Sequence, residues 1–372
     1  MAVVHSVSRT YRYRLYPTKT QKIELNRQLS AACQLYNAAL EERRYAWKYR
    51  HKSISFYDQY AQLKYIRADR TLDIPNFGVA AEVLRRVDRA FVAYFYRIKT
   101  NKGKAGYPRF RSRGRYDSIT FLKDNKGFKL RNSKHLYAQG IGDIRIKLHR
   151  PLEGQIKTVC IKRKADRWFV NFTVIHLEKL LPESIESVGI DVGLTEFATL
   201  SDGTEIANPR FYKNSQRKLR IAQRRIARRK RGSESRHKAV RILQRIHEHI
   251  HNQRSDFQHK ISREIVNQYG TIAVEDLNIK GLAASMLSKS VHDAAWGSFL
   301  FKLNYKAEDA GRLFVRVDPR GTSQKCSSCR ANVSKSLSDR QHICPNCGLN
   351  IGRDLNAARN ILRLGMSLAE LT

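Results

Sequence analysis

Acidic residues are scarce in this chain. Asp and Glu together number 33, against 71 Lys and Arg, so the 372 residues carry a formal net charge of +38. A compact body with this charge repels itself unless a polyanion neutralises it. Nucleic acid is the polyanion that this composition favours, and an acidic membrane surface is the alternative.

Long apolar runs are also missing. No stretch is long enough to span a bilayer, residues 1–5 lack the charged-then-apolar order of a signal peptide, and no lipidation motif occurs. We therefore expect a soluble intracellular protein with no membrane partner. The length allows two or three domains, and a hydrophobic fraction of 41% is enough for their cores.

Cysteine is the third scarce residue type. There are six cysteines, and four of them cluster near the C-terminus, which does not fit the disulfide framework of a secreted protein. Cys33 lies in a helical apolar pattern and Cys160 in a strand-like one. We expect both to be buried as small hydrophobic side chains.

The clustered cysteines form two Cys-x-x-Cys pairs that fourteen residues separate: Cys326, Cys329, Cys344 and Cys347. This spacing predicts one Zn²⁺ site, because a tight turn aims each pair at one point and a hairpin brings the pairs together. Four thiolates leave no open coordination position, so the zinc is expected to be structural.

Helical periodicity dominates the chain from residue 18 to about residue 100. Before it, residues 10–16 alternate like a strand, and Thr18 with Gln21 has the pattern of a capping box. A second long helix is expected from Asn76, with an apolar face made of Val83, Val87, Phe91, Phe95 and Ile98.

Residues 101–182 have a period of two instead, with a turn expected at Ala165-Asp166. This pattern indicates a small antiparallel barrel or sandwich. The strand of residues 10–16 could join the same sheet, and the helical lobe would then be an insertion in a β domain.

The second half of the chain alternates strands and helices. Residues 187–206 have the pattern of three strands, with a hairpin turn at Asp202-Gly203. Residues 210–231 carry eleven Lys or Arg and no acid, in a long helix-turn-helix excursion that breaks near Gly232-Ser233. The remaining expected elements are a buried strand over 271–276, a helix over 294–310, a strand over 313–317 and a last helix that carries Asp354 at its start. This order resembles the ribonuclease H-like arrangement.

Three acids hold distinctive places in that arrangement. Asp191 lies on the first strand, Glu275 ends the central strand, and Asp354 begins the last helix. Taken singly, each could be a turn residue, a strand end or a helix cap. Together they predict a site for two Mg²⁺ ions, which activate a water and stabilise the leaving 3′ oxygen in phosphodiester hydrolysis. Gly189 and Gly193 beside Asp191 are expected to permit close approach of a substrate backbone.

The chain resembles the TnpB family of RNA-guided nucleases, which insertion sequences encode. The resemblance spans nearly the whole chain and rests on the motifs GIDVGL (189–194), VEDLNIKG (274–281), DPRGTSQKCSSC (318–329), RDLNAARNI (353–361), YRYRLYPT (11–18) and GYPRFR (106–111). By motif matching, the three acids stand at the catalytic positions of the family and the four clustered cysteines at its zinc positions. Gly352 is a departure, because the family commonly has an acidic residue before Arg353.

The resemblance implies a multidomain α+β fold. A wedge domain with a β-barrel would comprise residues 1–17 and 105–182, with a helical recognition lobe at 18–104. A ribonuclease H-like (RuvC) nuclease domain would comprise residues 186–320 and 350–372, with a zinc ribbon that binds target nucleic acid inserted at 321–349.

The resemblance also implies the partners. One protein chain would bind one guide RNA, recognise a short transposon-adjacent motif in double-stranded target DNA, and cut both strands at one RuvC site in the cytoplasm of a bacterium or archaeon, at the nucleoid. A transposon regulator that binds DNA without cutting it, a compact type V CRISPR-like effector and an unguided resolvase-like nuclease are the alternatives.

Two basic segments are the expected nucleic-acid contacts. The first interleaves cations with aromatic rings, which could stack on unpaired bases, and the denser second segment would line a guide–target duplex. The predicted residues are Lys104, Tyr107, Arg109 and Arg111 in the first segment, with Phe110 and Tyr116 as further rings, and Arg217, Arg220, Arg224, Arg225 and Arg228 in the second. A metal site at His247, His249 and His251 is not expected, since exposed helical positions explain this spacing.

Overall fold

The computed structural model describes residues 6–69, 71–100, 105–112, 114–122, 127–177, 180–284, 288–336 and 338–370. These residues form two compact units with the boundary after residue 177. None of the helices in the described part of the chain is both long and apolar enough to cross a membrane.

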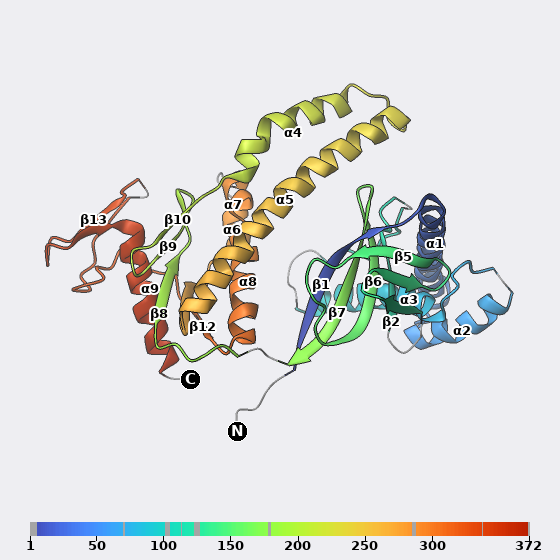
Figure 1. The fold of residues 1–372 in the computed structure, drawn as a ribbon, viewed down its shortest axis with the longest axis horizontal. Helices are drawn as coiled ribbons and strands as arrows, with labels where there is room; N and C mark the ends of the chain where they lie inside the picture. Colours follow the sequence, from blue (N-terminus) through green and yellow to red (C-terminus); the bar gives the residue numbers. More distant parts are fainter. Residues whose placement is uncertain are drawn as a thin grey trace. The chain divides into compact units, whose positions relative to one another are not determined.

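The first unit contains a seven-stranded sheet in the order β2-β6-β7-β1-β5-β4-β3 (Figure 1). Its strands are β1 (Ser6–Tyr16), β2 (Ser118–Leu122), β3 (Phe128–Arg131), β4 (His135–Ala138), β5 (Gly142–Lys147), β6 (Gln155–Lys164) and β7 (Arg167–Leu177). Every ladder is antiparallel. The first strand belongs to this sheet, which the sequence left as a possibility, and it lies between β5 and β7. The expected barrel is formed only in part, because no ladder among the described residues joins the edge strands β2 and β3.

Three helices lie between β1 and β2 in the chain, so the helical lobe is an insertion in the β domain. They are α1 (Lys19–Arg50), α2 (Phe56–Ala68) and α3 (Phe77–Thr100). Thr18 and Gln21 form the predicted capping box of α1. The predicted apolar face of α3 is wrong at its end, where Phe95 is 60% and Ile98 51% exposed. The buried residues of α3 stop at Phe91, and the last turns extend past the core.

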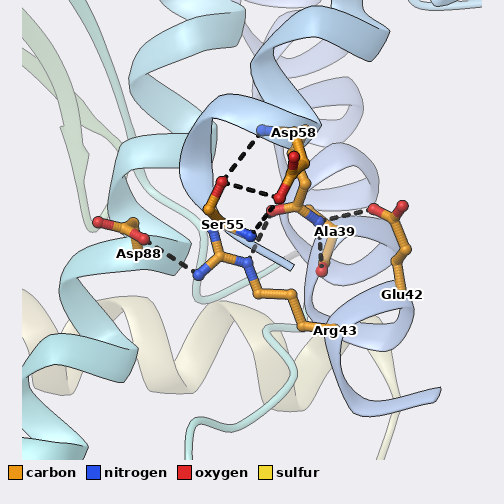
Figure 2. A network of polar contacts seen from close by, with 7 residues as sticks. Ala39, Glu42, Arg43, Ser55, Asp58 and Asp88 are labelled. Atoms are coloured by element: carbon orange, nitrogen blue, oxygen red, sulfur yellow. Dashed lines mark hydrogen bonds and ion pairs between the residues drawn. The ribbon is translucent and has the colours of Figure 1, made fainter. Parts of the chain in front are cut away.

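Arg43 joins these three helices through a buried polar network (Figure 2). Its Nε donates to Gln59 Oε1 on α2 at 2.8 Å, and its Nη1 donates to Asp88 Oδ1 on α3 at 3.1 Å. Gln59 in turn donates to the carbonyl oxygen of Ala39 on α1 at 2.8 Å. Because a buried cation is costly unless it is paired, the network favours one arrangement of the helices.

The two isolated cysteines of the first unit differ in burial. Cys33 is buried on α1 and its Sγ donates to the carbonyl oxygen of Arg111 at 3.2 Å. Cys160 on β6 is only partly buried. The prediction of two buried small side chains is therefore confirmed for Cys33 and wrong for Cys160.

The second unit contains a five-stranded sheet in the order β10-β9-β8-β11-β12 (Figure 1). Its strands are β8 (Ser187–Asp191), β9 (Glu196–Leu200), β10 (Glu205–Ala207), β11 (Thr271–Glu275) and β12 (Leu313–Val317). The first three strands pair antiparallel, whereas β11 pairs parallel with both β8 and β12. This confirms the three strands expected over residues 187–206, and Gly203 takes a φ of +97° in the predicted hairpin turn.

The helices of this unit are α4 (Phe211–Ala227), α5 (Glu234–Gln268), α6 (Ile279–Ala283), α7 (Ser288–Ala294), α8 (Trp296–Asp309) and α9 (Arg353–Ala369). The sequence predicts α4, α5, α8 and α9 but not the short α6 and α7. The strands β13 (Gln341–Ile343) and β14 (Asn350–Gly352) form a separate hairpin-like pair.

The five-stranded sheet has a different helical layer on each face. Ile190 on β8 and Val274 on β11 belong to the apolar cluster that α5 and α8 complete. Ala273 on β11 belongs instead to a cluster with Ile361 of α9. Since side chains alternate along a strand, the residue that follows Ile190 and the residue that follows Val274 both lie on the α9 face.

The helices α4 and α5 form a hairpin that projects as a long arm from the sheet (Figure 1). Gly232 has a φ of +82°, and Ser233 caps α5 by accepting from Arg236 N at 3.2 Å, which confirms the predicted break. The start of α4 is held by Asp293 of α7, whose carboxylate accepts from Tyr212 N at 2.9 Å and Lys213 N at 3.2 Å.

Candidate active site

Two of the predicted acids end neighbouring parallel strands. In the ladder between β8 and β11, Ile190 pairs with Val274, so Asp191 and Glu275 are the next residues in register. Both side chains lie on the α9 face of the sheet, as the alternation requires. Parallel strands place their carboxyl ends at the same edge, which is where ligands bind in many open sheets.

The third acid comes from the helix that covers this face. Asp354 lies in the first turn of α9, where Gly352 is the N-cap and provides no side-chain hydrogen bond. Asp354 Oδ2 is 4.0 Å from the position that a Cβ on Gly193 would take. Asp354 thus lies beside the turn that directly follows Asp191.

The three carboxylates interact electrostatically. Burial raises the pKa of Asp191 well above its ordinary value, and the charges of Glu275 and Asp354 raise it further, while Arg353 opposes the shift. Burial also raises the pKa of Glu275, although a hydrogen bond from Thr322 lowers it. Partly buried carboxylates that repel one another favour a bound cation, and an all-oxygen donor set suits Mg²⁺.

The four clustered cysteines have sulfur atoms that all lie within 4.8 Å of one another. Among the described residues, no other group of three or more His, Cys, Asp or Glu side chains is this close together. The three acids do not form such a closed set. His247, His249 and His251 do not belong to one either, and all three are exposed on α5.

The cysteine sulfurs are spaced as zinc ligands are. Cys326 Sγ is 3.6 Å from Cys347 Sγ, and Cys329 Sγ is 3.5 Å from Cys344 Sγ. Thiolates arranged tetrahedrally about 2.3 Å from one zinc ion are about 3.8 Å apart. All four are free cysteines, so the geometry fits one zinc ion with no open position.

Each cysteine pair lies on the same kind of turn. The carbonyl oxygen of Cys326 accepts from Arg330 N and that of Cys344 accepts from Gly348 N, both at 3.0 Å. Arg330 and Gly348 both have a left-handed backbone, with φ of 66° and 73°. The side chain of Asn346 and the backbone of Ala331 lower the pKa of Cys329 to about 6, whereas the pKa of Cys347 in the same cluster is raised to about 11. The lowered pKa of Cys329 favours the thiolate form that binds zinc.

Gly189 has a different role from the one predicted. A Cβ at this position would overlap the carbonyl oxygen of Ala358 and the backbone nitrogen of Leu362, which belong to α9. The missing side chain therefore admits the helix that carries Asp354, not a substrate backbone. Gly365 of α9 likewise lets the helix pack closely on the sheet, because a Cβ at this position would overlap Ala273 of β11.

Sequence reasoning missed Thr322. The Thr322 hydroxyl oxygen is 2.5 Å from Glu275 Oε1, and the residue is buried in the turn that precedes Cys326. A lone threonine in a loop carries no signal of this role, because only the fold brings residue 322 to the end of β11.

The predicted basic residues of α4 lie on its exposed side. Arg217, Arg220, Arg224, Arg225 and Arg228 are all exposed, whereas Leu219 and Ala222 are buried. An open hollow of about 640 Å³ on this arm is lined by Ile221, Arg224, Arg225, Arg228, Arg229 and Ser235. A positively charged hollow of this kind suits a phosphate backbone.

The predicted aromatic and basic segment before β2 is placed in part. Lys104 lies outside the described residues. Arg109 and Arg111 are exposed, and Tyr107 is 40% exposed beside the rings of Phe91 and Tyr94. Tyr116 is buried, and burial raises its pKa to about 12, so the expectation that this ring stacks on a base is wrong.

Phe110 offers an exposed ring in the same segment. It is 48% exposed, and the guanidinium of Arg44 lies 5.1 Å from its centroid. Arg44 also lies 5.8 Å from the ring of Tyr107. An arginine between two exposed rings is a suitable surface for an unpaired base.

Three protein-family models match this chain. They are the probable transposase family OrfB_IS605 over residues 173–286, a Cas12f1-like TNB domain over 296–361, and a helix-turn-helix domain over 1–52. Residues 6–50 form β1 and the single helix α1, so the name of the third model does not describe what these residues form here.

Relatives match over almost the full chain. A protein of Streptomyces pristinaespiralis, provisionally named an RNA-guided DNA endonuclease, is 33% identical over 98% of this chain and 91% of the relative. InsQ of Escherichia coli K12, with the same provisional description, is 27% identical over 95% of this chain and 92% of the relative. The cryo-EM structure of a Cas12f1–sgRNA–target DNA complex covers 96% of this chain and 98% of that chain, with a TM-score of 0.63 at 16% identity, a likeness of fold.

Proposed function

The chain belongs to the OrfB_IS605 family, which includes the TnpB-like proteins, and we propose that it is an RNA-guided DNA endonuclease of an insertion sequence. It binds a transposon-derived guide RNA, recognises a short motif in double-stranded DNA, and cuts the DNA at one nuclease site. Two relatives that match along nearly the entire chain are provisionally named RNA-guided DNA endonucleases, which supports this proposal.

The single observation that carries the nuclease site is the common face of three acids. Asp191 and Glu275 end adjacent parallel strands, and Asp354 starts the helix that covers them. We assign these residues as the ligands of two Mg²⁺ ions, which supply an activated water and stabilise the leaving oxygen when they are bound.

The domain layout that this function requires follows the predicted boundaries. Residues 186–320 and 350–372 would form the RuvC nuclease domain, and the strand order of the second unit supports this assignment. Residues 321–349 would form the zinc ribbon with one structural Zn²⁺. Residues 1–17 and 105–182 would form the wedge domain around the recognition lobe of residues 18–104.

The nucleic-acid contacts would come from both basic segments. The exposed arginines of α4 would neutralise phosphates along a guide–target duplex, whose backbone such a protein holds without reading its sequence. The segment from Tyr107 to Arg111 would combine phosphate contacts with stacking on Phe110.

Guided cleavage by an Asp191→Ala variant tests the proposal. The purified protein with its guide RNA should cut a matched DNA duplex in Mg²⁺, and the variant should retain RNA binding but lose cutting. Glu264→Ala, which removes an exposed acid from α5, is the matched control and should cut normally. Wild-type protein that binds RNA and target but never cuts would instead favour the regulator without cleavage.

Removal of the RNA separates guided from unguided cleavage. Protein stripped of RNA should not cut, and a guide of changed sequence should redirect the cut. Unchanged cutting by the stripped protein would contradict guidance and favour the resolvase-like alternative.

A further inference from the structure

We infer that Thr322 is a positioning residue for Glu275, and that Asn356 and Asn360 tie the turn of Thr322 and the first cysteine turn to the helix that carries Asp354. The inference rests on the proposed nuclease site, because it concerns how two of its ligands are held. Thr322, Asn356 and Asn360 are neither among the three acids nor among the four cysteines.

The first contact is direct. Thr322 Oγ1 lies 2.5 Å from Glu275 Oε1 and 3.0 Å from the carbonyl oxygen of Pro319. One hydroxyl proton serves one strong hydrogen bond, and a carboxylate accepts more strongly than a neutral carbonyl. Thr322 is only 4% exposed, so water does not compete freely for this bond.

The helix α9 holds the turn that contains Thr322. Asn360 Nδ2 donates to the carbonyl oxygens of Thr322 at 2.9 Å and Lys325 at 2.7 Å. Asn360 is 2% exposed. A buried amide that spans both ends of the turn from residue 322 to residue 325 restricts the position of the Thr322 hydroxyl.

A second asparagine connects the same helix to the cysteine turn. Asn356 Nδ2 donates to Lys325 O at 2.8 Å, and its Oδ1 accepts from Ser327 N at 2.9 Å. Lys325 and Ser327 flank Cys326. Asn356 is fully buried, and it lies two residues after Asp354 on α9.

These contacts form one continuous network. The Thr322 hydroxyl is hydrogen-bonded to Glu275, and the Thr322 carbonyl oxygen is hydrogen-bonded to Asn360. The carbonyl oxygen of Lys325, just before Cys326, accepts from both Asn356 and Asn360. The zinc ribbon is therefore the scaffold that fixes the orientation of Glu275 relative to α9. Groups that orient metal ligands typically change metal affinity or activity about 10- to 100-fold when they are removed.

Thr322→Val and Thr322→Ser provide the test. Valine keeps the shape but loses the hydroxyl, whereas serine keeps the hydroxyl. Binding of Mn²⁺ to the RNA-bound protein, measured by electron paramagnetic resonance, should weaken about 10- to 100-fold in Thr322→Val and stay within about threefold of wild type in Thr322→Ser. Guided cleavage should follow the same order at limiting Mg²⁺, and RNA affinity should not change.

Thr204→Val is the matched control, because Thr204 is exposed in the turn between β9 and β10. It should bind Mn²⁺ as wild type does. Wild-type binding and cutting by Thr322→Val would overturn the inference while the proposed function stood. Failure of wild-type protein itself to bind Mn²⁺ or to cut would instead contradict the proposed function.

Asn360→Asp tests the link through α9 by itself, so the network stays testable if Thr322→Val folds poorly. Where both variants fold, a double-mutant cycle completes the test. Asn360→Asp preserves the shape but removes the donors to Thr322 and Lys325. It should weaken Mn²⁺ binding by itself, and with Thr322→Val the combined loss should be smaller than the sum of the two losses. Purely additive losses, or no loss in Asn360→Asp, would overturn the network.

Discussion

At the scale of the residue, Asp191 shows how a carboxyl group among other acids can oppose folding. Its carboxyl group is buried next to Glu275 and Asp354, and the resulting rise in its pKa means that the folded protein holds the proton more tightly than the unfolded chain. Stability then falls as the pH rises through the raised pKa, because ionisation brings buried like charges together.

Asp191→Asn should therefore stabilise the metal-free protein at neutral pH and reduce cleavage about 100-fold or more. The advantage in melting temperature over wild type should grow as the pH rises above the ordinary carboxyl pKa. It should disappear towards about pH 4, where the wild-type carboxyl is protonated in the folded protein and uncharged like the Asn side chain. Thermal melts across this range, with Asp256→Asn as an exposed control, provide the measurement. A variant that became relatively less stable as the pH rose would contradict the electrostatic argument.

Gly189 is a second residue whose role depends on what packs against it. Gly189→Ala should destabilise the protein by about 1–3 kcal/mol or more, because its Cβ would overlap the backbone of α9. Gly352→Ala is the matched control, since a Cβ there meets nothing within 4 Å and its φ of −57° suits alanine. Urea denaturation of both variants checks the difference, and equal stabilities would show that α9 does not need the glycine.

At the scale of the element, the start of α4 depends on a group from outside the helix. Asp293 of α7 accepts from the backbone of Tyr212 and Lys213, and it also pairs with Arg254 of α5 at 3.0 Å. Arg210, at the N-cap position, makes no side-chain cap. A single carboxylate thus connects three helices at the base of the basic arm.

Asp293→Ala should cost about 1–2 kcal/mol locally, because it removes the cap and leaves Arg254 without this partner. Hydrogen exchange measured by mass spectrometry should show faster exchange at the start of α4, with little change in the five-stranded sheet. Asp256→Ala, which breaks an exposed pair with Lys260, should leave α4 exchange unchanged. Unchanged exchange in Asp293→Ala would show that the cap does not hold the arm.

At the scale of the whole molecule, the excess of positive charge, +38 in net terms, makes nucleic-acid binding sensitive to salt. Counterions released from the nucleic acid make the logarithm of the affinity fall linearly with the logarithm of the salt concentration. Cations already paired with carboxylates release fewer counterions than unpaired ones, so net charge by itself does not predict the slope.

Two sets of five Gln substitutions separate these effects, and both lower the net charge from +38 to +33. The first set replaces Arg217, Arg220, Arg224, Arg225 and Arg228 of α4. The control set replaces the carboxylate-paired Arg27, Arg131, Arg241, Lys260 and Arg316. RNA-binding titrations should show a slope shallower by about 4 for the first set and nearly unchanged for the second. Equal slopes would mean that α4 does not contact phosphates.

Much of the local structure was predictable because short-range patterns determine it. The capping box at Thr18, the hairpin turn at Gly203 and the break at Gly232 each depend on neighbours within a few residues. The two cysteine turns are also set by short-range contacts. One is closed by a hydrogen bond between residues 326 and 330, and the other by a hydrogen bond between residues 344 and 348. Tyr116 and Phe95 were predicted wrongly, because local pattern does not say where a core ends.

The amino-acid sequence by itself determined most of the longer elements, the cysteine spacing and the excess of positive charge, because each depends on composition or on contacts close in the chain. The tertiary structure decided which distant groups meet: Thr322 with Glu275, and Gly189 with the backbone of α9. Such contacts join residues dozens to more than a hundred positions apart, and they arise only when strand register and helix packing place both partners on the same face of the sheet.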